Sequence, residues 1–270
     1  MKKTVFITGT SSGFGKLTAN KFHAEGWNVI ATMRSPERET ELTQLDNVLV
    51  TALDVTDKQS IEEAVALGLA RFGTIDVLIN NAGHALNGPL EATSSDAMRR
   101  QFDTNFFGLI DVTKAVLPTM RKHRKGVVIN FSSMGGRVAF PITSLYHASK
   151  YAVEGLTESL QYELNPLGIK LKLIEPGAYN TNLLVSNEFA GVDDDSDYKP
   201  ILDATFAAFA QMGDAQQDPQ EVADATFLAA TDDTETLRYP VGQDTLQTFA
   251  AREQMDDVEF KTMIAGACGL

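Results

Sequence analysis

The fold is decided by the stretch TVFITGTSSGFG, residues 4–15, in which an apolar run leads straight into a glycine-rich turn. TVFIT predicts a β-strand, and GFGKLTANKFHAEG after it predicts an α-helix that ends near Gly26. Glycine lets the backbone turn sharply between the two elements, and it lets an anion approach the N–H groups of the helix N-terminus. The order strand, glycine turn, helix therefore favours a nucleotide-binding α/β fold.

The same alternation of strand and helix continues along the chain. Helical patterns cover roughly residues 56–72, 95–122, 149–164 and 219–230. Further strands are predicted at WNVIAT (27–32), VLVTALDV (48–55), IDVLIN (75–80), GVVINFS (126–132), IKLKLIE (169–175) and RYPVG (238–242). Strands that alternate with helices form βαβ units. We therefore expect an α/β protein, a doubly wound Rossmann-like domain with a mostly parallel seven-stranded sheet.

No linker or repeat divides the chain, so a single domain over residues 1–270 is expected, with a C-terminal helical tail over 243–270. One region departs from the alternation, because residues 179–216 combine an acidic cluster around Asp193 with scattered apolar residues. Long insertions after the carboxyl end of a strand are where α/β enzymes place lids. We therefore predict a helical substrate lid at 183–216 that closes on ligand binding, with an ordinary pair of surface helices as the alternative.

Composition excludes several classes of function. The chain has 36 acidic and 23 basic residues, a formal net charge of −13 and a pI near 4.7, which disfavours binding to nucleic acid or to a membrane surface. The single cysteine, Cys268, fits a reducing compartment, and no apolar run is long enough for a signal peptide or a membrane helix. A cytoplasmic protein is expected. The four histidines show no metal-ligand spacing, so no metal is expected.

Several further motifs fall at the carboxyl ends of predicted strands, which lie along one edge of a doubly wound sheet. NNAG (80–83) follows one strand, Ser132 and Ser133 end another, and Pro176-Gly177 ends a third. Tyr146 and Lys150 stand four residues apart on a predicted helix, so their side chains share one face. A phenol and an ammonium are thereby brought to the same pocket.

In this combination the chain resembles the short-chain dehydrogenases/reductases. TGxxxGxG, NNAG, YxxxK and the later Pro-Gly match that family in order and spacing over roughly residues 3–182, together with the RYPVG strand. The resemblance implies that Ser133, Tyr146 and Lys150 are catalytic, with Asn105 as a fourth member that places a water in a proton relay. It also implies a homodimer or homotetramer. The residues assigned to the cofactor are Gly9, Ser11, Ser12, Gly13, Phe14, Gly15, Arg34, Asp54, Val55, Asn81, Ala82, Gly83, Tyr146, Lys150, Pro176, Gly177 and Thr181.

The chemistry of carbonyl reduction explains these residue types. Hydride addition to a carbonyl produces an alkoxide that must receive a proton, and a free tyrosine is a poor acid–base at neutral pH. We expect the Lys150 ammonium to lower the pKa of Tyr146, and Ser133 to hydrogen-bond the substrate oxygen. Lys150 is also implied to hold the nicotinamide ribose. His147, beside the tyrosine, is predicted to lie on the helix surface, with a place at the edge of the pocket as the alternative.

The cofactor preference depends on the end of the second predicted strand. NAD-specific folds place an acid there for the ribose 2′-OH, whereas this chain has Met33 followed by Arg34, which is suited to a 2′-phosphate. NADP(H) is therefore the preferred cofactor. NAD(H) is the alternative, because NADP users of the family often have a basic residue at the position before Gly13, where this chain has Ser12. Asp54 is expected to contact the adenine with either cofactor. A dinucleotide sensor without turnover and a sugar-nucleotide epimerase are further, less favoured alternatives.

The substrate is predicted to be a small, apolar carbonyl compound or alcohol. Short signals, ATMR after the second strand and RYPVG near the end, are similar to the hydroxysteroid and retinol dehydrogenase branch. The candidate pocket residues, besides the aliphatic residues of the insertion, are Met134, Phe140, Pro141, Leu145 and Tyr179.

Overall fold

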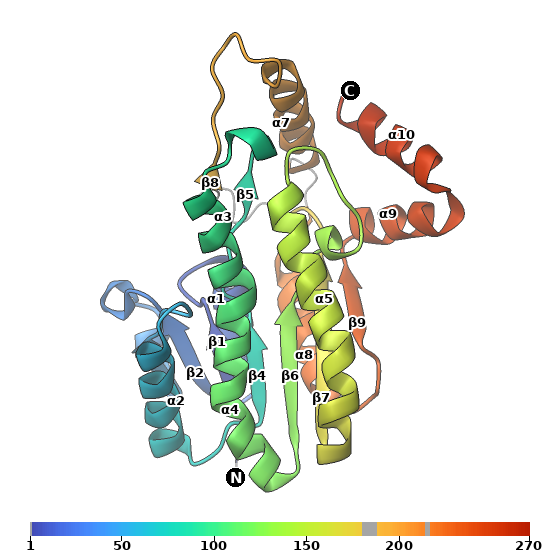
Figure 1. Cartoon of the computed structure of the whole chain (residues 1–270). Coiled ribbons are helices and arrows are strands. Elements are labelled where there is room, and N and C mark those ends of the chain that lie inside the picture. Colours follow the sequence, from blue (N-terminus) through green and yellow to red (C-terminus); the bar gives the residue numbers. More distant parts are fainter. Residues whose placement is uncertain (1, 180–187, 214–216) are drawn as a thin grey trace.

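The computed structural model describes residues 2–179, 188–213 and 217–270 (Figure 1). Its main sheet has seven strands in the order β3-β2-β1-β4-β6-β7-β9, and every pairing between neighbours is parallel. The strands are β1 Thr4–Thr8, β2 Asn28–Met33, β3 Val48–Ala52, β4 Val77–Asn80, β6 Gly126–Phe131, β7 Ile169–Pro176 and β9 Arg238–Val241. The predicted doubly wound parallel sheet is confirmed.

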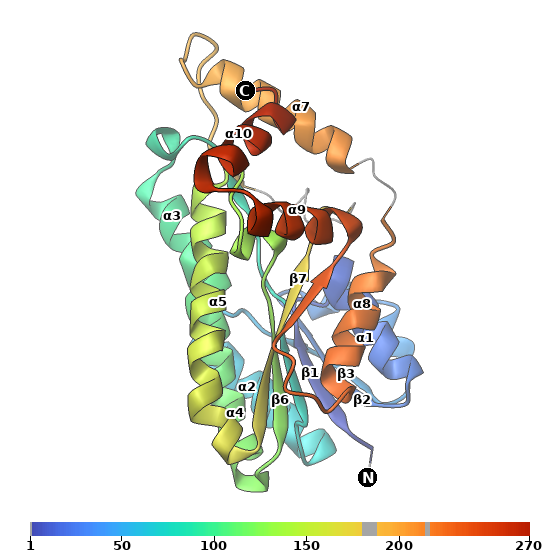
Figure 2. The ribbon, with the colours of Figure 1, turned by 90° about the vertical axis from the view of Figure 1, so that its right-hand side faces the viewer.

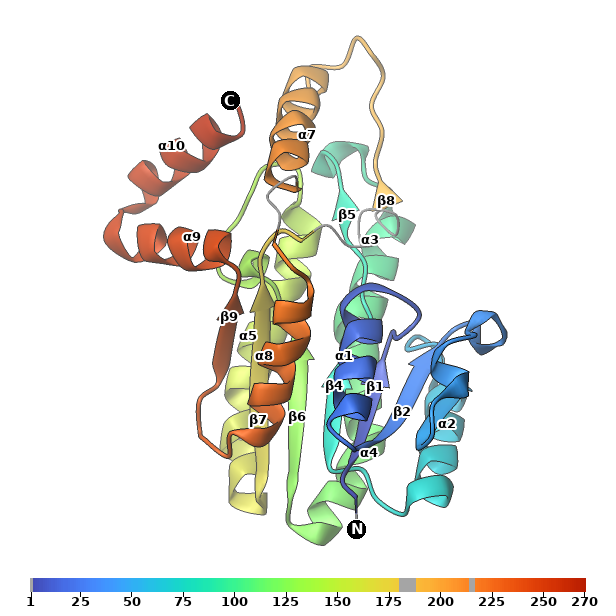
Figure 3. The same cartoon turned by 180° about the vertical axis from the view of Figure 1, so that it is seen from behind.

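Helices cover both faces of the sheet. α1 (Gly13–Ala24) and α8 (Gln220–Thr231) pack on one face, which is nearer the viewer in Figure 3. The other face carries α2 (Lys58–Phe72), α4 (Leu109–His123) and α5 (Ser144–Leu164), seen from the front in Figure 1. No helix in the described ranges is long and apolar enough to cross a bilayer.

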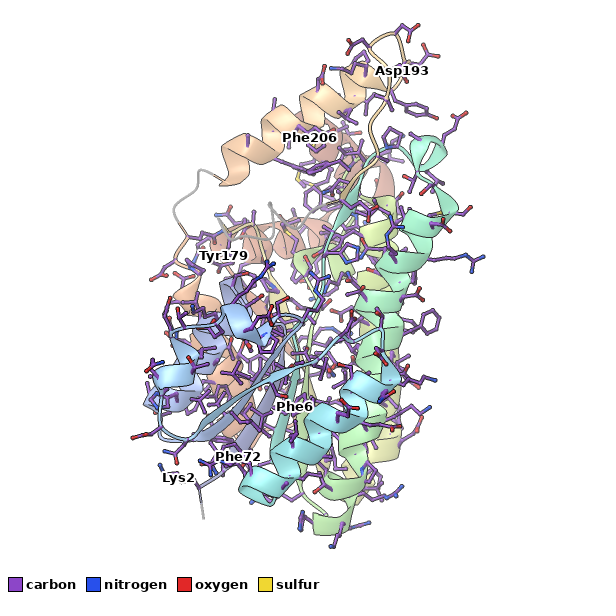
Figure 4. The ribbon with its side chains drawn as sticks, turned by 90° about the vertical axis from the view of Figure 1, so that its left-hand side faces the viewer. Lys2, Phe6, Phe72, Tyr179, Asp193 and Phe206 are labelled. Carbon is purple, nitrogen blue, oxygen red and sulfur yellow. The ribbon has the colours of Figure 1, made fainter. Side chains whose placement is uncertain are left out.

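Alternating side chains of the strands divide the core into two layers. Val5 and Ile7 of β1 join the cluster under α1 and α8, whereas Phe6 between them joins the cluster under α2 and α4. All three side chains are fully buried. Figure 4 shows Phe6 in the second layer, into which Phe72 at the end of α2 also packs. Because strands of this kind are buried on both faces, their sequences are continuous apolar runs, and this is why they could be recognised.

The strand order reverses direction at β1. The chain runs from β1 through β2 to β3 at one edge, and β4 then returns to the other side of β1. The connections after β1 and β4 leave in opposite directions, which opens a crevice at the carboxyl ends of these two strands. The glycine turn and the NNAG segment both lie at this crevice.

The helix expected over 95–122 is interrupted. α3 spans Ser95–Phe102, a π-helical segment spans Asp103–Gly108, and α4 follows. The π segment carries Asn105, whose amide is tied to the backbone of His84. Gly108, the last residue of the π segment, packs against the loop that follows β3. A Cβ on Gly108 would lie 2.7 Å from the Val55 carbonyl oxygen in that loop. Tertiary contacts therefore override the regular helical period here. Short π segments inside α-helices are frequent at functional sites.

A smaller layer lies over the carboxyl edge of the sheet (Figures 1 and 2). β5 (Leu86–Asn87) and β8 (Glu188–Phe189) form a short parallel ribbon beneath α7 (Lys199–Gly213). Figure 4 shows Asp193, of the acidic cluster, in the loop before α7 and Phe206 on that helix. β8 and α7 account for the described part of the predicted insertion, and residues 180–187 and 214–216 lie outside the described residues.

The C-terminal segment consists of two helices, α9 (Gln243–Gln254) and α10 (Asp257–Ala267). Phe249 of α9 and Phe260 and Ile264 of α10 are buried in a separate apolar cluster. Met134, Phe140 and Ala208 of α7 pack against that cluster. The tail therefore supports the loop after β6 and the α7 helix from outside.

A buried polar network crosses the sheet between β4 and β6. The Asn80 side-chain nitrogen donates to the Thr113 hydroxyl and to the Asn130 side-chain oxygen, both at 2.9 Å. Asn130 in turn donates to the Thr157 hydroxyl at 2.9 Å. The network links two central strands to α4 and α5, and all four residues are buried.

We expect Asn130→Ala to lower the free energy of unfolding by about 2 kcal/mol or more, because it removes two buried hydrogen bonds. Urea denaturation measures the loss, and Ser159→Ala, at an exposed position of α5, is the control. Asn80→Ala should cost less in the Asn130→Ala background than alone, since the two side chains share a bond. Strictly additive losses would show that the network is not a unit.

Candidate active site

The turn between β1 and α1 is shaped by glycine. Gly9 has a φ of +74°, in the left-handed region that glycine favours. A Cβ on Gly15 would lie 2.1 Å from the Gly9 carbonyl oxygen, so only glycine lets the first turn of α1 approach the loop. The N-cap residue Ser12 makes no side-chain capping bond. The first N–H groups of α1 therefore face the crevice and suit an anion such as a pyrophosphate.

The crevice opens into a cleft of about 770 Å³. It contains every residue assigned to the cofactor from the sequence except Thr181, which lies outside the described residues. Its other lining residues are Met33, Leu53, Thr56, His84, Arg100, Asp103, Thr104, Phe131, Ser132, Ser133 and Glu188. One cleft thus joins the ends of β1 to β4, β6 and β7, the shape that an extended dinucleotide requires.

Two polar side chains are placed at one end of the cleft, where the adenosine half is expected. Asp54 follows β3, and its carboxylate accepts hydrogen bonds from the Thr56 N–H at 2.9 Å and the Thr56 hydroxyl at 2.7 Å. Arg34 follows β2 and is exposed at the rim, next to the buried Met33. Among the ion pairs of the described residues, none engages Arg34. The guanidinium is thus available to an incoming anion.

Tyr146 and Lys150 lie one turn apart on α5 and face the same cleft. The Lys150 Nζ lies 5.8 Å from the centre of the Tyr146 ring and donates to the Phe131 carbonyl oxygen at 2.8 Å. Ser133 begins the turn after β6, and its hydroxyl oxygen accepts from the Gly135 N–H at 3.0 Å. Ser133 and Tyr146 line the same cleft, and the Ser133 hydroxyl influences the pKa of the tyrosine.

The electrostatics of this group differ from the expectation. Burial raises the pKa of Tyr146, and the hydrogen bond with Ser133 opposes that rise. Burial also lowers the pKa of Lys150, to about 8, because the ammonium is removed from water. The pKa of Tyr146 is therefore raised and not lowered as expected, because desolvation is the largest influence on it. A cationic nicotinamide ring, when bound, would act in the opposite direction to this desolvation.

Asn105 is buried behind the cleft and does not line it. Its side-chain nitrogen donates to the His84 carbonyl oxygen at 2.9 Å and to the Ser149 hydroxyl at 3.3 Å. Its side-chain oxygen accepts from the His84 N–H at 3.1 Å. The side chain therefore holds the loop after NNAG against α5, and its role in a proton relay stays a prediction.

A smaller pocket of about 180 Å³ adjoins the cleft at Tyr146. Two of the candidate substrate residues, Met134 and Phe140, line it, whereas Pro141, Leu145 and Tyr179 do not. Tyr179 is buried and packs edge-on against Phe14, with ring centres 5.5 Å apart. The lining residues are Ala85, Asn87, Ser133, Met134, Gly135, Phe140, Thr143, Tyr146, His147, Gly177, Ala178 and Phe209.

His147 is not on the helix surface, the favoured expectation, but lines the small pocket, as the alternative had it. Only 6% of it is exposed, and its Nδ1 accepts from the Phe140 N–H at 3.3 Å. Burial lowers its pKa to about 4, so the ring is neutral at physiological pH. The loop 134–143 folds over the start of α5 and covers this face, an arrangement that helical periodicity does not indicate.

Sequence reasoning also missed side chains at the mouth of the cleft. Arg100 of α3 forms an ion pair with Glu188 of β8, and His84 lines the same part of the cleft. The His84 pKa is lowered, mainly by burial. The position of His84 directly after NNAG was a usable signal. Nothing in the sequence paired Arg100 with Glu188, which is 88 residues away.

A family model described as short chain dehydrogenase matches residues 3–189. The chain belongs to the short-chain dehydrogenase family. The oxidoreductase YusZ of Bacillus subtilis is 44% identical over 255 residues, covering 90% of either chain. A 3-ketodihydrosphingosine reductase of Bacteroides thetaiotaomicron is 44% identical over 177 residues, covering 66% of this chain and 64% of that one. Retinol dehydrogenase 8 of Bos taurus is 37% identical over 240 residues, covering 82% and 75%.

Solved structures agree with this assignment. A short-chain dehydrogenase from Streptomyces avermitilis has a TM-score of 0.85 at 35% identity and covers 100% of this chain and 99% of its own. ElxO with NADP bound has a TM-score of 0.76 at 29% identity and covers 92% and 100%. This family member is an NAD(P)-dependent dehydrogenase or reductase, and its cofactor is a nicotinamide dinucleotide.

We expect Gly15→Ala to weaken NADPH binding at least about 10-fold, because the added methyl group forces the helix N-terminus away from the Gly9 carbonyl. Fluorescence titration with NADPH measures the affinity. Gly155→Ala is the matched control, since its Cβ would meet nothing within 4 Å on an exposed face of α5. The control should bind normally and gain up to about 1 kcal/mol of stability. Unchanged affinity in Gly15→Ala would remove the loop from the binding site.

Proposed function

We propose that the protein interconverts a carbonyl compound and an alcohol with NADP(H), and that Tyr146 is the acid–base. One observation carries the proposal: Ser133, Tyr146 and Gly177 line both the large cleft and the small pocket. A dinucleotide in the cleft and a substrate in the pocket would therefore meet at the phenol. This placement is what a proton transfer coupled to hydride transfer requires.

The roles of the chain's own residues follow from their positions. A substrate oxygen within reach of Ser133 and Tyr146 accepts hydrogen bonds from both hydroxyls, which stabilise the charge that develops on it. Tyr146 gives its proton to that oxygen during reduction and takes it back during oxidation. Lys150 is held beside the phenol by the Phe131 carbonyl, so its charge favours the phenolate that reduction leaves. A bound nicotinamide supplies or accepts the hydride.

The small pocket favours an apolar substrate. Met134, Phe140 and Phe209 provide its apolar wall, and Phe209 comes from α7 of the insertion. The described insertion thus borders the pocket, which supports its proposed role as a lid. The polar residues Asn87 and Thr143 leave room for one further polar group on the substrate. Two of the relatives are named for a ketone reductase and for an alcohol dehydrogenase, which supports the same reaction class here.

The preference for NADP(H) is supported by the end of β2. An acid at this position would bind the ribose 2′-OH of NAD, and the buried Met33 provides no acceptor. Arg34 follows at the rim of the cleft, where a guanidinium can pair with a 2′-phosphate. ElxO was solved with NADP, whereas a 3-ketoacyl-(acyl-carrier-protein) reductase from Brucella melitensis, 26% identical, was solved with NADH. Membership of the family therefore does not determine the cofactor, and the preference has to be inferred from Met33 and Arg34 of this chain.

We expect Tyr146→Phe to lose at least about 10²-fold in turnover while binding NADPH normally, because only the proton donor is removed. The assay follows NADPH oxidation with a panel of aldehydes, ketones, steroids and quinones. Tyr151→Phe is the control, since that tyrosine lies on the same helix but is 47% exposed. Full activity in Tyr146→Phe would rule out the mechanism. A wild type that binds NADPH and turns over no substrate would instead support a dinucleotide sensor.

We expect Arg34→Leu to lower kcat/KM for NADPH by roughly 10- to 150-fold, because a charge-assisted bond to phosphate contributes about 1.5–3 kcal/mol. Met33→Asp should also shift the preference toward NADH through repulsion of the 2′-phosphate. Arg38→Leu is the control, since Arg38 is exposed and does not line the cleft. A wild type that already prefers NADH, or an Arg34→Leu variant that equals the control, would assign the enzyme to NAD(H).

A further inference from the structure

Two carboxyl groups are buried behind the catalytic lysine. Glu154 lies one helical turn after Lys150 on α5, and Glu175 lies on β7 directly before Pro176. Only 6% of Glu154 and 0% of Glu175 is exposed. Acidic side chains are almost never buried to this degree unless they are paired or protonated. Neither residue lines the cleft or the small pocket, so neither belongs to the surface of the active site.

Two arginines reach the pair from the solvent side. The Arg238 Nε of β9 lies 3.0 Å from the Glu154 Oε2 and 3.4 Å from the Glu175 Oε1. An Arg137 nitrogen lies 3.7 Å from the Glu175 Oε2. Both arginines are partly exposed and are also shared with surface acids, Arg238 with Glu158 and Arg137 with Glu253. Their charge is therefore only partly available to the buried pair.

Several oxygens of this cluster accept no hydrogen bond within the described part of the chain. They are the Glu154 Oε1, both carboxyl oxygens of Glu175 and the Ser132 hydroxyl, and all are buried. A Cβ on Gly136 would lie 2.3 Å from the Ser132 hydroxyl and 3.2 Å from the Glu154 Oε1, so these two oxygens gather at one glycine. Unpaired acceptors in such a place are expensive unless one carboxyl is protonated and donates a bond.

Coulomb repulsion gives the same answer. Two neighbouring carboxylates in a buried site cannot both ionise, so one proton stays between them. Burial, and next the charge of Glu154, raise the pKa of Glu175 well above the usual range of a carboxylic acid, with Glu154 as its hydrogen-bond partner. The charge of Glu154 also raises the pKa of Lys150, against the burial that lowers it.

We propose that Glu154 and Glu175 share one proton, and that the negative charge left on the pair keeps Lys150 in its ammonium form. Glu154 is thus a positioning residue that acts through Lys150. The protonated Glu175 donates a hydrogen bond to Glu154 and thereby reduces the cost of burying the Glu154 carboxylate. The proposal rests on the proposed function, in which the lysine charge assists Tyr146. The groups that face the pair are Lys150 and Glu158 of α5, Arg238 of β9, and Arg137 of the loop after β6, with Glu253 of α9 behind Arg137.

The first experiment measures the lysine without any turnover. A ¹³C NMR titration follows the Lys150 Cε signal, assigned with Lys150→Arg, in the wild type, in Glu154→Gln and in Glu158→Gln. Glu158→Gln is the matched control, because it removes another acid bonded to Arg238 on the same helix. We expect the Lys150 pKa to fall by about one unit in Glu154→Gln and to stay unchanged in the control, with partial recovery in Glu154→Asp. Equal values in the wild type and Glu154→Gln overturn the proposal.

The second experiment tests the shared proton. Between pH 5 and 8 the folded protein would hold a proton on Glu175 that the unfolded chain has released, so the free energy of unfolding falls as pH rises. Glu175→Gln mimics the protonated form and should remove this fall, so the variant gains stability relative to the wild type toward pH 8. Urea denaturation at several pH values measures the difference. A difference that is constant with pH overturns the shared proton.

The pH profile of alcohol oxidation then connects the pair to catalysis. With less positive charge on Lys150, Tyr146 should deprotonate at higher pH, so the acid limb of the kcat profile moves up by about one unit in Glu154→Gln and not in Glu158→Gln. A shifted lysine titration with an unshifted kcat profile would contradict Lys150's part in the proposed function. An unshifted lysine titration contradicts the role of the pair alone.

Discussion

The bond network of Asn81 at the end of β4 is the constraint on which the site depends. Its side-chain nitrogen donates to the carbonyl oxygens of Thr8 and Gly9, both at 2.9 Å, and its own N–H donates to the Thr8 hydroxyl at 3.0 Å. These bonds join the ends of β1 and β4 where the sheet changes direction. The glycine turn, the N-terminus of α1 and the NNAG backbone are thereby held as one rigid rim. The cleft lies along this rim, since Gly9, Asn81 and Gly83 all line it.

In the catalytic group, by contrast, the ionisable side chains are buried and largely desolvated. Lys150 is 7% exposed and bonded to a main-chain carbonyl, and Glu175 behind it is fully buried. Burial makes the protonation states of such groups depend strongly on one another, because little water screens them. The chemistry of Tyr146 is therefore set by residues beyond those that touch a substrate. A list of motif residues describes only the front of the site.

The sequence was sufficient to predict most of the architecture and to name residues that the structure brings together in one cleft. Runs such as TVFIT and IDVLIN are apolar because their strands are buried on both faces, and the glycine turn needs backbone angles that few other residues adopt. What it missed depends on contacts between distant segments. The π segment at Asn105, the covered ring of His147 and the Arg100–Glu188 pair arise from loops that fold onto helices. Local sequence periodicity does not predict such tertiary contacts, so these features were seen only in the structure.

The position of the C-terminal helices has a consequence for how such a protein diversifies. Phe249, Phe260 and Ile264 pack with Met134 and Phe140, which line the small pocket, whereas the dinucleotide cleft is formed by the ends of β1 to β4, β6 and β7. Changes around Phe249, Phe260 and Ile264 can therefore reshape the space offered to a substrate without touching the dinucleotide cleft, whereas Asp244 at the start of α9 bonds the Ala178 N–H beside that cleft. Selection can act on the two separately. The C-terminal helices can thus change the shape of the substrate pocket from outside, while Ser133 and Tyr146 on its reactive side stay the same.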